Sequence, residues 1–190
     1  QFLEDDIPWL VSQNATIVVS IAGETVEEYA LLASKLNQVS AIAAIEVNIS
    51  CPNVENRGQV FSCDPHTTFA AINAVKKKLK SALPIIAKLS PDVTDIASIA
   101  EIALNAGANA IALINTLLGM VIDIDTMLPK LAGKTGGLSG PAIRPVAVRA
   151  ICQVKQRLHH EHNIVMGGDT SGSDALEMIL DGASASAVGP

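Results

Sequence analysis

The feature of this sequence that most limits its fold is a regular alternation of strand-like and helix-like segments. Short apolar runs typical of buried strands occur at 16–21, 44–50, 84–89, 110–114, 164–166 and 185–188. Amphipathic patterns that predict helices lie at 25–36, 65–83, 94–106, 141–159 and 173–180. Because alternating strands and helices form parallel sheets, the chain predicts either an open doubly wound sheet or a (β/α)8 barrel.

Two observations favour the barrel. No GxGxxG motif follows the first strand, which removes the main support for a dinucleotide-binding fold. Polar side chains also stand at the ends of successive strands, at Ser20, Asn48, Lys88 and Asn115, and barrel enzymes collect their active sites at such ends. Polar residues mark the start of many loops, so at any single position both interpretations stay open. We predict one domain over residues 1–190, a (β/α)8 TIM barrel with about six of its eight strands in this chain.

Composition and charge exclude several classes of protein. The 190 residues are 49% hydrophobic with a net charge of −6, which argues against disorder and against a nucleic-acid surface. Apolar runs fall short of the roughly 18 to 20 residues of a membrane span. Three cysteines without a CxxC pair indicate a reducing compartment, so we expect a soluble cytoplasmic protein. The first residue is not Met, and we expect it to lie inside a longer protein. The four histidines fall at expected helix ends, so no metal site is predicted.

One long segment, 115–140, breaks the alternation. It exceeds a simple connection between a strand and a helix, and it contains a possible hairpin through Val121, Ile122 and Leu131. Such excursions are usually functional. Its dense apolar residues predict that it covers a ligand and forms part of an interface.

A thiol between two amides is the main chemical signal. Asn48 and Asn53 flank Cys51 where a strand runs into a loop. Carboxamides suit a ring with C=O and N–H groups, such as a pyrimidinedione. A thiol with an ordinary pKa of about 8.5 can act as a base near neutral pH. A buried structural cysteine beside turn-forming asparagines has the same sequence, so both interpretations stay open here.

Several segments together resemble a known family. Residues 47–54 with Gly58 and Phe61, and residues 88–96, 114–119, 136–143 and 182–185, are similar in order and spacing to dihydroorotate dehydrogenases, specifically the class 1B catalytic subunit. The resemblance covers essentially the whole chain. It implies a (β/α)8 barrel that binds FMN and oxidises dihydroorotate to orotate in the synthesis of UMP.

The resemblance also implies roles for individual residues. Cys51 matches the base that takes a proton from the substrate while hydride passes to the flavin. Hydride transfer leaves negative charge on the flavin, and Lys88 at a strand end can serve as the cation that stabilises it. The positions that match the pyrimidine site are Asn48, Asn53, Asn115 and Thr116. The expected FMN contacts are Ser20, Asn48, Lys88, Ile114, Gly140, Gly167, Gly168, Gly189 and Pro190. The implied partners are a second copy of the chain and a subunit with FAD and a 2Fe-2S cluster that passes electrons to NAD.

The sequence departs from the family at three places and in its extent. Ser20 stands where the family has Asn, Asp169 puts a carboxylate near the expected phosphate, and Pro190 lacks the N–H of the usual Thr. The first two barrel strands and the last helix of the family have no counterpart here. Two alternatives therefore stay open: a non-catalytic homologue kept as an interaction module, and a flavin-free barrel lyase that uses Lys88 as a Schiff-base amine.

Overall fold

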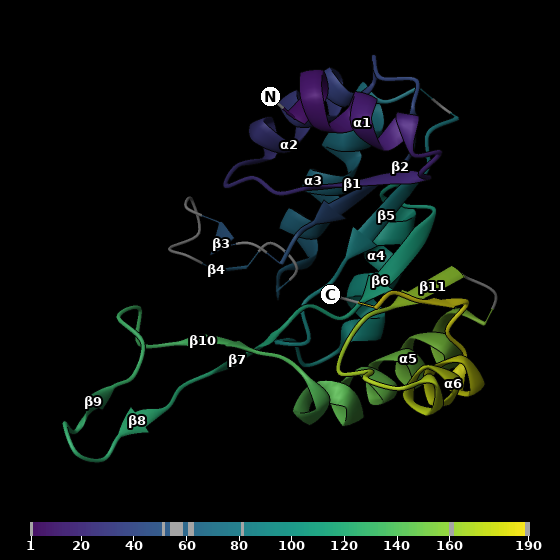
Figure 1. Cartoon of the computed structure of the whole chain (residues 1–190). Helices are drawn as coiled ribbons and strands as arrows, with labels where there is room; N and C mark the ends of the chain where they lie inside the picture. Colours follow the sequence, from purple (N-terminus) through teal and green to yellow (C-terminus); the bar gives the residue numbers. More distant parts are fainter. Residues whose placement is uncertain are drawn as a thin grey trace.

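The computed structural model describes residues 2–50, 52–53, 59–60, 63–80, 82–159 and 162–188. Its centre is a six-stranded parallel sheet whose strands follow the order of the chain (Figure 1). The strands are β1 (Ile17–Ile21), β2 (Ile42–Asn48), β5 (Ile85–Lys88), β6 (Ala110–Leu113), β11 (His162–Val165) and β12 (Ala185–Ser186). All six predicted strands are confirmed. Within the described ranges β1 and β12 remain the two edges of the sheet, so it forms an open part of a barrel.

Helices pack on one side of the sheet, and all but the first of them connect successive strands of the sheet. They are α1 (Ile7–Ser12), α2 (Val26–Leu36), α3 (Pro65–Lys78), α4 (Ile96–Asn105), α5 (Arg144–Leu158) and α6 (Gly172–Asp181). A π-helical turn, η1 (Phe2–Asp6), precedes α1, and a 3-10 turn, η3 (Pro141–Ile143), precedes α5. The side chains of Thr25, Asp64, Asp95 and Ser171 cap α2, α3, α4 and α6 by accepting from the backbone N–H three residues on.

Two helix predictions were wrong in their bounds. The helix expected over 65–83 ends at Lys78, because Leu79 is extended and the chain turns so that Leu79 and Leu83 pack against the core. The helix expected over 141–159 divides into η3 and α5. His162, expected at the end of that helix, begins strand β11 instead.

The two faces of the sheet have different side chains. Large residues such as Ile45, Ile111 and Leu113 are fully buried on the outer face, in one core with α2 to α6. The inner face carries a small separate cluster of Ala44, Ile86 and Ala112. Alternation along each strand produces both sets, as barrels require. At the β1 edge the inner face is open, since Val18, which pairs with Ala44, is 51% exposed.

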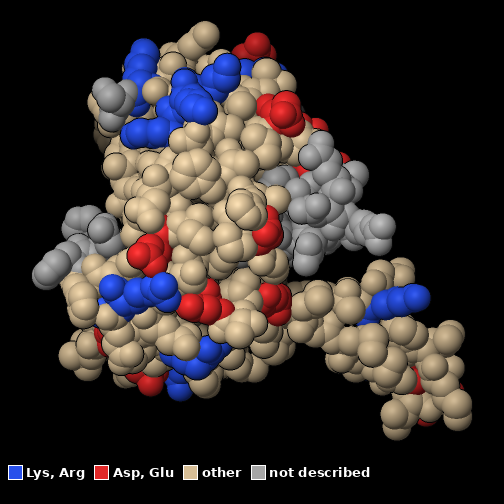
Figure 2. Space-filling view, turned by 180° about the vertical axis from the view of Figure 1, so that it is seen from behind, with Lys and Arg blue, Asp and Glu red and all other residues tan. Residues whose placement is uncertain are grey.

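Residues 117–138 leave the body of the protein as a long antiparallel excursion, which we call the arm (Figure 1). Its root is the pair β7 (Leu117–Gly119) and β10 (Gly136–Leu138), and its tip is the pair β8 (Ile122–Asp123) and β9 (Leu128–Pro129). The predicted hairpin is therefore confirmed. Figure 2 shows a largely uncharged surface on the arm. A shorter hairpin pairs β3 (Pro52–Asn53) with β4 (Gln59–Val60). Among the residues described, none of the helices is long and apolar enough to cross a membrane.

Candidate active site

A cavity of about 380 Å³ lies at the carboxyl ends of the central strands. It brings together seven residues that the sequence predicts for the site: Lys88, Ile114, Asn115, Thr116, Gly140, Gly167 and Gly168. These residues come from the ends of β5, β6 and β11 and from the loop before α5. Parallel strands carry their loops to one edge of the sheet, which explains how residues 80 positions apart in the sequence meet.

Lys88 is the buried charge of this cavity. It is the last residue of β5 and only 7% of its surface is exposed. In the part of the chain that the structure describes, Nζ contacts Sδ of Met166 at 3.5 Å. A thioether is a weak acceptor, and a buried ammonium needs strong acceptors or an anion. The cavity therefore presents a cation suited to an electron-rich or negatively charged ligand atom.

Two amides meet beside Lys88. Nδ2 of Asn115 donates to Oδ1 of Asn48 at 3.3 Å, and the backbone N–H of Ser50 donates to the same oxygen at 3.2 Å. Asn48 pairs with Lys88 in the register of β2 and β5. The hydroxyl of the buried Tyr29 on α2 donates to the backbone carbonyl of Asn48 at 2.7 Å, which holds the end of β2 against that helix. The ends of β2 and β6 thus present an amide pair on either side of the lysine strand.

Glycines let two loops approach closely at the far side of the cavity. Gly168 has a φ of +79°, and a Cβ there would lie 2.6 Å from the carbonyl oxygen of Gly140 and 2.8 Å from the nitrogen of Arg144. The loop after β11 therefore rests on the backbone where η3 leads into α5. Glycine-rich loops in the second half of a barrel are a common place for a phosphate.

Asp169 lines the same cavity with its carboxylate already engaged. Oδ2 accepts from the hydroxyl of Ser186 at 2.7 Å, and Oδ1 accepts from the N–H of Gly167 at 3.4 Å. The side chain thus joins the end of β11 to β12. The sequence predicts that this carboxylate would repel a phosphate. In the structure the carboxylate lies at the cavity wall, where both of its oxygens accept hydrogen bonds from the protein.

Of the remaining predicted site residues, Ser20 lies away from the cavity. Ser20 is on β1, two strands from Lys88, where its hydroxyl donates to Oε1 of Glu46 at 2.9 Å. Asn53 is described only by its place in β3. Cys51, Gly189 and Pro190 lie outside the described residues, so their predicted roles stay predictions.

Sequence reasoning did not single out five of the residues that line the cavity. They are Ser139, Ile143, Met166, Thr170 and Ala187. All five lie in loops or in the 3-10 turn of the structure, whereas the sequence patterns place Ile143 in a predicted helix and Met166 and Ala187 in predicted strands. Among them Ser139 stands next to a glycine, Gly140, but this pattern is common in loops and does not single out a site residue.

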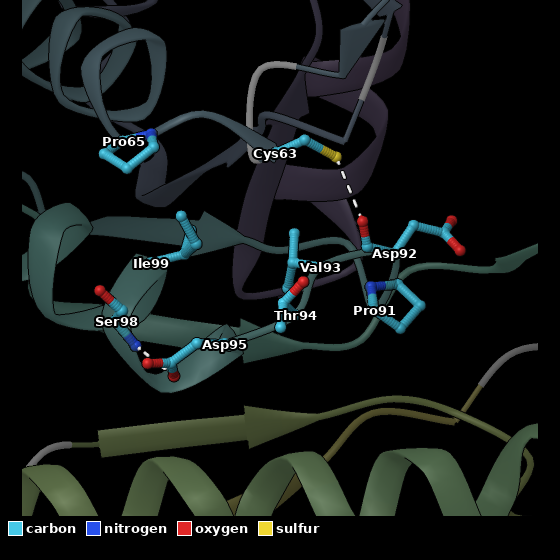
Figure 3. A pocket seen from close by; sticks show the side chains of 9 residues that line it. All are labelled: Cys63, Pro65, Pro91, Asp92, Val93, Thr94, Asp95, Ser98 and Ile99. Atoms are coloured by element: carbon cyan, nitrogen blue, oxygen red, sulfur yellow. Dashed lines mark hydrogen bonds between the residues drawn. The ribbon is translucent and has the colours of Figure 1, made fainter.

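A larger hollow of about 660 Å³ lies between the beginnings of α3 and α4 (Figure 3). Its polar groups are used within the protein: Asp95 caps α4 by accepting from the N–H of Ser98, and the thiol of Cys63 donates to the carbonyl of Asp92. Burial, and then the charge of Asp92, raise the pKa of Cys63, which keeps the thiol protonated. This hollow has the larger volume, but the cavity at Lys88 has the buried charge that could bind a ligand. The cavity at Lys88 is therefore the candidate active site. The described residues contain no cluster of metal ligands.

Asp174 accepts hydrogen bonds from Thr170, which lines the cavity, and replacing Asp174 should destabilise the fold. Its buried carboxylate accepts from the N–H of Thr170 at 3.0 Å and from the hydroxyl of Thr170 at 3.2 Å, and it pairs with Arg144. We expect Asp174→Ala to lower the free energy of unfolding by about 2 to 4 kcal/mol, because these partners lose a buried charge. Urea unfolding measures this change. Glu177→Ala, which removes the exposed second partner of Arg144, is the control and should change it by less than about 0.5 kcal/mol. Equal effects of the two variants would contradict the supporting role of Asp174.

Taken together, an open parallel barrel sheet with a lysine, an amide pair and glycine loops at its carboxyl edge defines a protein of the (β/α)-barrel fold class. A family model described as dihydroorotate dehydrogenase matches residues 2–190, and the chain belongs to this family. The family and the fold predicted from the sequence are thereby confirmed.

Individual relatives agree with the family. The chain is 53% identical over 187 residues to the dihydroorotate dehydrogenase B (NAD(+)) catalytic subunit of Desulforudis audaxviator, with 98% of this chain and 60% of that protein covered. The protein of the same description from Citrifermentans bemidjiense is 47% identical over 188 residues, with 99% and 61% covered. The chain thus spans about 60% of the length of these relatives.

A solved structure supports the fold alone. The dihydroorotate dehydrogenase of Eimeria tenella, crystallised with ferulenol, superimposes with a TM-score of 0.72 at 18% identity. The match covers 97% of this chain and 55% of that one.

Proposed function

We propose that this chain belongs to the catalytic barrel of a class B dihydroorotate dehydrogenase, an oxidoreductase that converts dihydroorotate to orotate with FMN in the synthesis of UMP. The observation that carries the proposal is the buried Lys88 at the cavity, next to the contacting amides of Asn48 and Asn115. A fixed cation beside paired amides suits a flavin that gains negative charge and a ring with C=O and N–H edges.

The residues present fit FMN. The ammonium of Lys88 meets no strong acceptor among the described residues, and a flavin carbonyl would supply one. Ile114, which lines the cavity, and Asn48, which contacts Asn115 there, would hold the ring system. Gly140, Gly167 and Gly168 would leave backbone space for the phosphate. Ser20, Gly189 and Pro190 complete the proposed set by resemblance. When bound, FMN supplies the ability to accept a hydride.

The chain's own residues would bind the substrate and move its proton. Asn48, Asn53, Asn115 and Thr116 would hydrogen-bond the edges of the pyrimidine ring and orient it. The thiolate of Cys51 would take the proton from a ring carbon as hydride leaves the neighbouring carbon. Lys88 would stabilise the charge that develops on the flavin.

Partners follow from the same proposal. The relatives are named catalytic subunits, which supports a second subunit, for which we propose FAD and a 2Fe-2S cluster that pass electrons to NAD. We also propose a homodimer in the cytoplasm. The arm supports an interface, because its tip exposes large apolar side chains, among them Ile124 and Met127 at 85% and 82%.

The lyase alternative rests on one observation, the burial of the amine of Lys88 at a cavity. A Schiff-base enzyme needs such an amine. Reduction with borohydride in the presence of a carbonyl substrate would attach that substrate to Lys88, whereas the oxidoreductase shows bound-flavin absorbance. The observation in favour of the non-catalytic alternative is the carboxylate of Asp169 at the cavity wall. A non-catalytic protein would show neither substrate attached to Lys88 nor bound-flavin absorbance.

Titration with FMN tests the proposed cofactor. We expect the 190-residue chain alone to bind FMN about a hundredfold more weakly than a fusion in which the Desulforudis audaxviator protein supplies the length this chain does not span. The reason is the open inner face at β1, where Val18 is exposed and the flavin lacks contacts. Quenching of flavin fluorescence measures both affinities. Tight binding by the chain alone would show that six strands suffice, and absence of binding by the fusion would contradict the FMN proposal.

A further inference from the structure

Asp92 contacts two separate segments near the mouth of the barrel. It lies in the loop between β5 and α4, two residues after the buried Ser90, whose hydroxyl accepts from the N–H of Asp92 at 3.1 Å. Its backbone carbonyl accepts from the thiol of Cys63 at 3.4 Å (Figure 3). Its two carboxylate oxygens accept from the N–H of Leu118 at 3.3 and 3.1 Å. One residue thus joins the end of β5, the segment that follows β4 and the root of the arm.

The root of the arm is also part of the cavity wall. Leu118 comes two residues after Thr116, whose N–H donates to Oδ1 of Asn115 at 2.8 Å. Leu118 pairs with Gly137 on the returning strand, and a Cβ on Gly137 would lie 2.2 Å from Oγ1 of Thr116. The position of Leu118 therefore sets the position of Thr116, and with it the amide of Asn115 at the cavity.

We propose that Asp92 is a positioning residue: it holds the root of the arm and the Cys63 segment to the end of β5, and so places Asn115 and Thr116 for a planar ring substrate. The part about the substrate rests on the proposed function, whereas the tie between Asp92, Leu118 and Cys63 does not. An ionised acceptor makes a stronger hydrogen bond than a neutral one, and two oxygens share one donor here.

Hydrogen exchange at the amide of Leu118 tests the tie in the chain as it is. We expect Asp92→Ala to speed this exchange about tenfold, because the N–H loses a charged acceptor. Asp92→Asn keeps one acceptor oxygen and should retain most of the protection. Asp123→Ala is the matched control, since Asp123 accepts from the N–H groups of Asp125 and Thr126 at the tip of the same arm. It should leave the exchange of Leu118 unchanged. Unaltered exchange in Asp92→Ala would overturn the tie.

Labelling of Cys63 with a disulfide reagent tests whether the two segments are held together. Both Asp92→Asn and Asp92→Ala remove the charge that raises the pKa of Cys63, so both should speed labelling. Only Asp92→Ala also removes the acceptor that holds the arm at Leu118. We therefore expect Cys63 to be labelled several-fold faster in Asp92→Ala than in Asp92→Asn. Equal rates in the two variants would overturn the coupling between the segments. Cys152→Ala serves as the background, so that the label reports fewer thiols.

Kinetics of the FMN-loaded fusion with the Desulforudis audaxviator protein test the positioning. We expect Asp92→Ala to raise KM for dihydroorotate about tenfold while kcat changes less than about twofold, because binding of the ring is disturbed more than the chemistry. Asp92→Asn should recover most of KM. Faster exchange at Leu118 with an unchanged KM would overturn the positioning role. If the unaltered protein oxidises no dihydroorotate, the proposed function fails, and the exchange and labelling results still decide the tie.

Discussion

Replacing Cys51 with alanine is expected to slow the reduction of bound FMN by dihydroorotate roughly 10²- to 10⁴-fold. Cys51 lies between Asn48 and Asn53 in the sequence, three residues after the last residue of β2. In the proposed reaction its thiolate takes the substrate proton, and alanine offers no group to accept it. Serine is a poor substitute, since a hydroxyl is far less acidic than a thiol. Anaerobic stopped-flow absorbance of the flavin measures the rate.

Cys152→Ala is the matched control for this experiment. Cys152 lies on α5, and burial, followed by the charge of Asp181, raises the pKa of its thiol. A protonated thiol on a helix outside the sheet has no part in the proposed chemistry, so flavin reduction should stay within about twofold of the unaltered protein. Equal slowing in the two variants would mean that Cys51 is not the base.

Lys88→Met is expected to slow flavin reduction roughly 10²- to 10³-fold without lowering the stability of the protein. Methionine keeps the length of the side chain but removes the charge. Because the buried ammonium contacts only the thioether of Met166 among the described groups, its removal relieves an unfavourable burial. The urea midpoint should therefore stay constant or rise while the rate falls.

Lys77→Met controls for the loss of a lysine, since Lys77 is exposed on α3. It should change neither the rate nor the urea midpoint. Full flavin reduction in Lys88→Met would show that Lys88 has no electronic role. A loss of stability by several kcal/mol would instead assign Lys88 to the fold.

The sheet could be predicted from the sequence because each strand is a short apolar run between helical patterns. The ends of strands were harder. The predicted strand 164–166 begins earlier, at His162, since the pairing of His162 with Ala110 extends the ladder through polar residues. The predicted strand 185–188 is shorter, and the hydroxyl of Ser186 is used by Asp169. An apolar run in the sequence indicates which residues are buried. The length of a strand depends instead on how many residues of the neighbouring strand pair with it.

Some residues of the candidate site could be predicted from the sequence and others could not. Lys88 and Asn115 could be predicted, because residues at the carboxyl ends of adjacent parallel strands necessarily meet. Ser139 and Thr170 could not, because their position depends on how the loop after β11 packs against Gly140 and Arg144. The sequence also gives no sign that Asp92 reaches Leu118, 26 positions along the chain.

The order of the strands has a consequence for how the protein is made. β1, β2, β5, β6, β11 and β12 lie side by side in the order in which a ribosome releases them. Each strand therefore finds its only earlier neighbour already in place, with just one helical crossover to close, and the arm at 117–138 is an insertion between two such steps. The sheet can grow at one edge during synthesis without waiting for a distant segment. Pausing translation after β6 should thus yield a nascent chain in which β1, β2, β5 and β6 are already protected from proteolysis.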